Sequence, residues 1–391
     1  MQKKLIALAV ASLAAGSVFA QSNVTISGLV AVSYNNYKIS DTTRPVATEN
    51  RLDDQTSRFT LKGTEDLGNG LSAYFQIENR ISADSRPNTA FGNAQGLADG
   101  ETFVGIKHKD IGSLGFGKFA MHYHETLGYT ESYRALNTQA YSVDIMGAVG
   151  GAFVAMNSRA QNAIKYDTPN WGGFSGKLAY SFNPAGNEGN ASYVNSGYAT
   201  GSFSPALNNQ YNKGGAWNIA GRYLNGPINA YASYWDYDTE GAARAGQRSW
   251  KVGGDYKFPF GLRVGLHYDD SKLVGATAAA DVKRTAWMLP ISYTFGANAV
   301  YLTYMKANDA RLNGVKVADT GAKKWVLAYD YALSKRTFVG ASYMNLKNDR
   351  FGTYSPWLAG ISTLGGTPTG VFAGTVGENA RQFSLNMTHF F

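Results

Sequence analysis

The sequence contains no cysteine among its 391 residues and only five histidines. A chain without cysteine has no disulfide framework and no thiol or redox site. His122 and His124 could share one face of a strand, but no third ligand accompanies them, so we expect no metal site. The Gly115-Phe116-Gly117 run precedes no helix and is not a nucleotide-binding loop. We therefore expect no cofactor.

Long apolar runs are also missing, because nothing beyond Ala20 approaches the roughly 18 consecutive apolar residues of a membrane-spanning helix. The apolar run that does occur covers residues 5–15 and is too short to span a bilayer. Lys3 and Lys4 precede this run, and a small-residue cleavage site follows it. This pattern predicts a signal peptide over residues 1–20 rather than a membrane anchor.

Cleavage there would leave residues 21–391 as one domain with 34 basic and 28 acidic residues, a net charge of +6. Charged residues are scarce, at 16% of the whole chain, whereas glycine (45), tyrosine (25) and phenylalanine (20) are abundant. An exported chain rich in glycine and aromatic residues and free of cysteine is typical of a Gram-negative outer-membrane barrel.

The last twelve residues alternate strictly between apolar and polar side chains, which is the period of a β-strand. One face carries Phe383, Leu385, Met387, His389 and Phe391, and polar residues fill most of the other face. A strand with one face in lipid and the other in an aqueous lumen has this pattern. It resembles the C-terminal assembly signal of bacterial outer-membrane proteins, with His389 as a minor departure.

Similar alternation predicts sixteen strands in the chain, and no helical period is sustained. The predicted strands cover 23–37, 55–65, 71–82, 101–109, 113–121, 161–168, 173–183, 215–224, 228–238, 248–258, 262–272, 283–295, 298–308, 323–333, 337–348 and 380–391. Short turns rich in Gly, Asn, Asp and Pro alternate with long loops. The sequence therefore predicts a 16-stranded antiparallel transmembrane β-barrel with short periplasmic turns, long extracellular loops and both termini on the periplasmic side.

The segment from Arg58 to Glu78 (RFTLKGTEDLGNGLSAYFQIE) resembles the second and third strands of the β-proteobacterial general porins, which include the neisserial porins. Residues 103–106, residues 162–166 and the closing Phe391 resemble that family as well. The resemblance implies a homotrimer of barrels in the outer membrane, each with a water-filled pore narrowed by an inward-folded third loop. Small hydrophilic solutes and ions would pass by diffusion, and the barrel-assembly machinery would recognise the C-terminal strand.

Strand parity predicts which side chains face the pore. If Phe59 and Leu61 face lipid, then Arg58 and Lys62 face the lumen, and the same argument places Glu78 and Arg80 there. Pairing around the 67–70 turn places Arg58 roughly across from Glu78. Arg159 and Lys165 would join the same basic wall.

The third loop, residues 122–158, should form the opposing wall of the constriction. The candidate constriction residues are Arg58, Lys62, Arg80, Arg159 and Lys165 on the basic wall, with Glu78, Glu125, Glu131, Arg134 and Asp144 as the acidic partners and loop residues. The family resemblance implies that Arg58 and Arg159 are the constriction arginines. A basic wall and a net charge of +6 predict a moderate, salt-dependent preference for anions.

The sequence leaves two other functions open. An 18-stranded channel specific for a sugar or an organic acid would require a further hairpin, for example within residues 349–379. An adhesive barrel would bind ligands through its loops and conduct nothing. No catalytic motif of a barrel protease or phospholipase is present, so we expect no enzyme, and the export signal argues against a nucleic-acid partner.

Overall fold

The computed structural model describes residues 23–40, 47–81, 83–84, 97–122, 142, 144–149, 152–153, 159–184, 214–238, 246–356 and 376–391. The predicted signal peptide lies outside these residues. Among the residues that the structure describes, no helix is long and apolar enough to cross a membrane. The described part is almost entirely β-strand, with one short 3₁₀ turn, η3 (Ala278–Ala280).

The long strands follow the predicted alternation closely. In chain order they are β1 (Asn23–Ser40), β2 (Ala47–Asp54), β3 (Arg58–Gly68), β4 (Leu71–Arg80), β5 (Thr102–His108), β6 (Gly112–Ala120), β9 (Arg159–Asp167), β10 (Phe174–Ser181), β11 (Ala216–Asn225), β12 (Ile228–Asp238), β13 (Gly246–Lys257), β14 (Leu262–Val274), β15 (Val282–Phe295), β16 (Asn298–Ala307), β19 (Ala322–Ala332), β20 (Thr337–Asn348) and β21 (Asn379–Phe390). Four two-residue strands lie in loops: β7 (Ala148–Val149), β8 (Ala152–Phe153), β17 (Arg311–Leu312) and β18 (Val315–Lys316).

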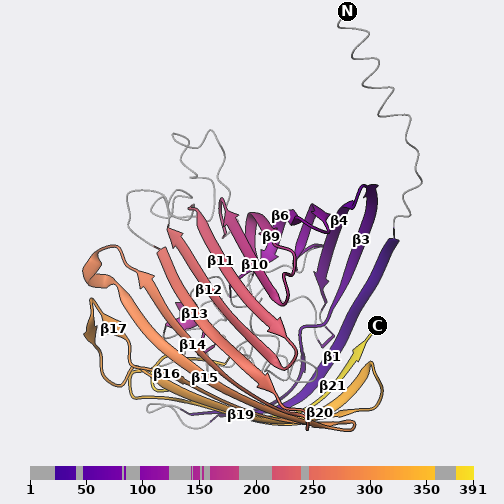
Figure 1. Cartoon of the computed structure of the whole chain (residues 1–391). Coiled ribbons are helices and arrows are strands. Elements are labelled where there is room, and N and C mark those ends of the chain that lie inside the picture. Colours follow the sequence, from indigo (N-terminus) through magenta and orange to yellow (C-terminus); the bar gives the residue numbers. More distant parts are fainter. Residues whose placement is uncertain are drawn as a thin grey trace, which may run out of the picture.

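The long strands close into a ring in which every neighbour is antiparallel. β21 pairs with β1 from Leu29↔Phe390 to Ser40↔Asn379, and Figure 1 shows these two strands side by side. β2 and β3 both pair with β1 and together act as one barrel strand, so the ring that the structure describes has sixteen strands. Because β20 pairs with β21 along its length, no hairpin from residues 349–379 can enter between them. The 18-stranded alternative is therefore wrong.

The second barrel strand is longer than predicted and broken in the middle. Residues 47–54 form β2, although the sequence predicted a loop over 38–54, and Thr56 between β2 and β3 has a positive φ of 63°. β2 has the sequence ATENRLDD, which lacks the apolar alternation of a lipid-facing strand. It extends the barrel wall beyond the apolar band, and for that reason the lipid pattern does not reveal it.

The turn between β3 and β4 shifts their predicted register. The connection needs only Asn69 and Gly70, both at positive φ, and a bulge lies between Asp66 and Gly68. Arg58 therefore pairs with Arg80, and Thr60 pairs with Glu78. The prediction that Arg58 lies across from Glu78 is wrong by two residues, although the predicted faces are unchanged.

The outer face of the barrel carries bands of aromatic residues on both sides of an aliphatic zone. Trp250 lies near Tyr268, Trp287 near Tyr304, and Trp325 near Tyr343, with ring centroids 5.3 to 5.4 Å apart. Tyr293 and Phe295 stack near the short-turn end. Phe383, Leu385 and Met387 of β21 are exposed between the two bands. Aromatic girdles with apolar side chains between them are the expected surface for lipid contact.

Gly63 of β3 gives a test of packing on this outer face. Its Cβ position is occupied by the ring of Phe75 from the neighbouring strand, whereas a Cβ on Gly221 of β11 would meet nothing within 4 Å. We expect Gly63→Ile to destabilise the barrel by about 1–3 kcal/mol, because the ring must be displaced. Gly221→Ile is the matched control and should be neutral or stabilising, since a β-branched residue suits a strand. The loss of heat-resistant, fast-migrating protein on gels with rising temperature measures both, and equal effects would contradict the packing argument.

Candidate pore constriction

The described part of the third loop lies inside the barrel and is fixed to the far wall. Asp144 accepts a hydrogen bond from Lys324 Nζ of β19 at 2.6 Å, and both side chains are fully buried. Arg284 of β15 pairs with Asp269 of β14 and also donates to the carbonyls of Met146 and Ala148. The loop thus crosses from β6 to β14, β15 and β19, which confirms the predicted inward fold for its described residues.

Apolar packing supports these polar anchors. Ile145 and Met146 are buried in one cluster with Met288, Met305 and Val326, which lie on β15, β16 and β19. At this level the loop and the barrel wall are therefore in apolar contact. Burial of this kind makes the two ion pairs costly to break singly, because the remaining charge would be left without its partner.

The beginning of the loop is fixed by a histidine. His122 is buried, its Nδ1 lies 2.8 Å from Ser233 Oγ, and its Nε2 lies 3.0 Å from Ser249 Oγ. Its backbone N–H donates to Asn218 Oδ1 at 3.2 Å. Burial, reinforced by the nearby charge of Lys251, lowers the pKa of His122 well below its usual value. With a serine hydroxyl at each ring nitrogen, His122 links the start of the loop to β12 and β13.

The centre of the basic wall is the carboxylate of Glu78. Arg159 Nη2 lies 2.8 Å from Glu78 Oε1, and Arg80 Nη2 lies 3.1 Å from the same oxygen. Arg58 and Arg80 each donate a guanidinium hydrogen bond to the carbonyl of Thr56, at 3.3 and 3.4 Å. Three of the predicted arginines are therefore brought together around the break between β2 and β3.

Lys118 of β6 belongs to the same group of charges but was not predicted. Its Nζ lies 2.8 Å from the carbonyl of Ala98 and 3.3 Å from that of Asp99. The Asp99 carboxylate in turn accepts from the backbone N–H of Arg80 at 2.7 Å. Strict alternation would place Lys118 on the lipid side with Phe116. The register shift between Gly117 and Phe119 breaks that alternation, so parity could not select the lysine.

The remaining predicted residues lie farther from Glu78 or outside the described chain. Lys165 Nζ is 3.4 Å from Asp167 and lies over the ring of Phe119. Lys62 is exposed and pairs across the strands with Gln76. Glu125, Glu131 and Arg134 lie outside the described residues.

Asp144 differs from its expected position. We expected this loop carboxylate to face the basic wall, but it points to β19 and is 1% exposed. The reason is the apolar contact of its neighbours Ile145 and Met146, which turns this stretch of the loop toward the far wall. Asp144 is thus an anchor of the loop.

Comparisons with known proteins agree with this geometry. The family model for the Gram-negative porin matches residues 7–350. The chain belongs to the Gram-negative porin family. This porin is 30% identical to outer membrane porin protein 32 of Delftia acidovorans over 398 residues, which cover 100% of each chain. It is 29% identical over 208 residues to the major outer membrane protein P.IB of Neisseria gonorrhoeae, covering 52% of this chain and 55% of that one.

A solved structure extends the comparison to the fold. The porin superimposes on the anion-selective porin from Comamonas acidovorans with a TM-score of 0.68 and 25% identity, over 95% of this chain and 100% of that one. The predicted resemblance to the general porins, the neisserial porins included, is confirmed. The protein is an outer-membrane diffusion porin, and porins are channels rather than enzymes.

Proposed function

We propose that the porin lets small hydrophilic solutes and ions diffuse passively, with a moderate preference for anions set at the arginines around Glu78. The observation that carries this proposal is that two guanidinium groups, of Arg80 and Arg159, share one carboxylate oxygen. These two guanidinium groups carry more positive charge than the one carboxylate carries negative charge, and Arg58 lies beside them at the carbonyl of Thr56. An anion in the lumen gains from this field, and electrolyte screens it. Anion selectivity of the Comamonas relative supports the same direction.

The reversal potential under a KCl gradient tests this proposal. We expect an anion-directed potential for the refolded porin in a planar bilayer, and a potential much closer to zero for Arg80→Ala/Arg159→Ala. Lys335→Ala, at an exposed short turn, changes charge away from the arginines and should leave the potential unchanged. A cation-directed potential for the unmodified porin would contradict the anion preference while leaving the channel intact.

We further propose the remaining features from the predicted processing and the family resemblance. The chain would be cleaved after residue 20, assemble as a homotrimer in outer-membrane lipid and have no enzymatic activity. The assembly machinery would recognise the last strand through Phe391. The main chain of Phe391 exchanges two hydrogen bonds with Gly28 of β1, at 3.0 and 3.1 Å. Recognition and barrel closure would therefore use the same residue. Mass measurement of the mature protein tests the cleavage, and native gels test the trimer.

A further inference from the structure

One extra residue interrupts the pairing of the second barrel strand with β1. β2 pairs with β1 as far as Asp54, and β3 pairs with β1 from Arg58 onward. Residues 30 and 31 of β1 therefore lie opposite residues 55–57, and we call residues 55–57 the bulge. Such an insertion changes the direction of the side chains that follow it.

The bulge changes which side chains of this strand face the lumen. Before it, odd-numbered residues face inward, since Asp53 accepts hydrogen bonds from the inward-facing Asn35 and Tyr37. After it, even-numbered residues face inward, Arg58 among them. Strict alternation from Asp53 would instead direct Phe59 into the lumen and Arg58 toward lipid. The bulge therefore places Arg58 in the pore.

Buried side chains hold the bulge in one conformation. Ser57 Oγ accepts from the backbone N–H of Ala31 at 3.0 Å and donates to the carbonyl of Ala31 at 3.3 Å. Gln55 Nε2 donates to Ser33 Oγ at 2.6 Å. Both Gln55 and Ser57 are buried. The serine hydroxyl thus replaces a strand partner for the main chain of β1.

Thr56, between these two residues, has a strained backbone that serves two arginines. Within the described ranges it is the only β-branched residue with a positive φ, at 63°. Such a conformation is costly and persists where the surroundings fix it. Its carbonyl accepts from Arg58 at 3.3 Å and from Arg80 at 3.4 Å. Arg58 and Arg80 pair directly across the strands, where like charges repel, and the shared acceptor offsets that repulsion.

The same arrangement occurs a second time beside Glu78. Ala98 also has a positive φ, at 67°, and its carbonyl accepts from Lys118 Nζ at 2.8 Å. Two left-handed residues other than glycine thus each present a carbonyl to cations of the constriction. The repetition indicates that the backbone at these points serves the placement of charge.

We propose that the bulge is a positioning element for ion selection, in which the carbonyl of Thr56 fixes Arg58 beside Arg80. Without this shared acceptor, repulsion between the guanidinium groups would move Arg58 away from the charges around Glu78. The positive field at the path of the ion would then weaken. This inference rests on the anion preference proposed above, and it assigns the placement of its charges to the main chain.

Reversal potentials under a KCl gradient at low salt test the proposal with two substitutions of one residue. Thr56→Pro fixes φ near about −65° and turns the carbonyl away from the arginines. We expect it to cause at least half of the change in chloride-to-potassium permeability that Arg58→Ala causes, which should be roughly threefold. Thr56→Gly keeps the left-handed backbone without strain, so the potential should stay the same and heat resistance on gels should rise.

A double variant and a milder variant separate positioning from damage to the wall. Arg58→Ala/Thr56→Pro should shift the potential little more than Arg58→Ala alone, because the carbonyl acts through Arg58. Ser57→Ala removes the hydroxyl that holds the bulge and should cause a smaller shift in the same direction. Conductance and heat-resistant gel mobility confirm folding, and Ser57→Ala decides the question if Thr56→Pro does not fold.

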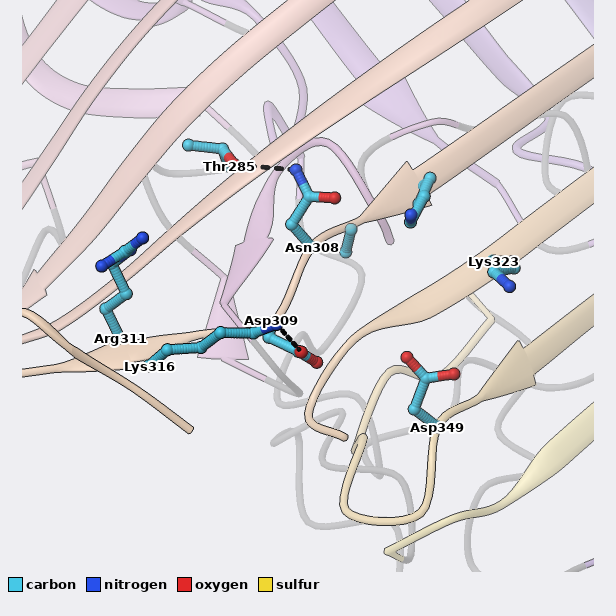
Figure 2. Close-up of a pocket in the computed structure, with 9 residues that line it drawn as sticks. Thr285, Asn308, Asp309, Arg311, Lys316, Lys323 and Asp349 are labelled. Carbon is cyan, nitrogen blue, oxygen red and sulfur yellow. Dashed lines mark hydrogen bonds and ion pairs between the residues drawn. The ribbon is translucent and has the colours of Figure 1, made fainter. Parts of the chain in front are cut away.

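Lys316→Gln is the control for loss of a cation elsewhere. Lys316 Nζ lies 3.0 Å from Asp309 at a pocket of about 390 Å³, and Figure 2 shows the two residues there with Arg311. Lys316 belongs to β18, which pairs with β17 and through it with β15, on a separate part of the wall from the bulge. This variant should leave the potential unchanged.

Three results would overturn the inference. Folded Thr56→Pro and Ser57→Ala could keep the potential of the unmodified porin while Arg58→Ala shifts it. The shifts of Thr56→Pro and Arg58→Ala could be additive, so that the carbonyl would act independently of Arg58. Arg58→Ala could cause no shift at all. The preference for anions itself is judged separately, by the sign of the potential of the unmodified porin and by Arg80→Ala/Arg159→Ala.

Discussion

Replacing Lys324 with methionine should release the third loop from the far wall and raise the mean conductance of the channel. Asp144 would keep its charge in a buried position without its partner, at a cost of about 3–5 kcal/mol. Such a cost favours opening of the loop by roughly two to three and a half orders of magnitude. Single-channel recordings in planar bilayers should show larger currents with new transitions between levels.

A double variant distinguishes the effect of an unpaired buried charge from the effect of losing the contact between loop and wall. Asp144→Leu/Lys324→Met removes both charges and leaves an apolar contact, which should restore steady currents close to those of the unmodified porin. Arg284 remains in place in both proteins and keeps its bonds to the loop carbonyls. Unchanged recordings for Lys324→Met alone would show that the apolar contact of Ile145 and Met146 holds the loop without the ion pair.

Replacing Glu78 with glutamine should increase the preference for anions about threefold to fivefold. A unit charge about 5 Å from the path of an ion contributes slightly under 1 kcal/mol in an aqueous pore. The change removes the negative charge of a carboxylate that Arg80 and Arg159 share, so the field of the two guanidinium groups at the permeating ion becomes stronger. The shift in reversal potential under a KCl gradient measures this effect directly.

Salt concentration and a second glutamate provide the controls. At 1 M salt the screening length is about 3 Å, so the effect of Glu78→Gln should nearly disappear. Glu65→Gln changes an exposed carboxylate on the outward-facing side of β3 and should leave selectivity as it is. A shift of equal size in Glu65→Gln, or none in Glu78→Gln, would place the selective charges elsewhere in the lumen.

The barrel could be predicted from the sequence because lipid imposes a simple pattern. Strands 228–238 and 337–348 were predicted at their observed bounds, since apolar alternation stops at Gly, Asn or Ser turns. Where lipid no longer contacts the strand, as in residues 47–54, the pattern vanishes and the strand was missed. The register of β3 against β4 depends on two turn residues and a bulge, which alternation cannot determine.

The candidate site could be predicted only in part, for a related reason. Parity identifies which face a side chain occupies, and so it placed Arg80, Glu78 and Arg159 in the lumen. It carries no information about contacts across the barrel, such as Asp144 with Lys324, because the two residues are 180 positions apart. Lys118 shows the limit within a single strand, where one irregular residue reverses the face.

Closure of the ring joins the first strand to the last, with Leu29 opposite Phe390. Contacts between such distant parts of the chain form late in folding, since loop closure must precede them. A truncated chain that lacks β21 therefore cannot close the barrel. The main chain of Phe391 exchanges two hydrogen bonds with Gly28 at this seam, so closure of the barrel depends on the last strand. Without β21, the edges of β1 and β20 would have no partner and the wall could not enclose a pore.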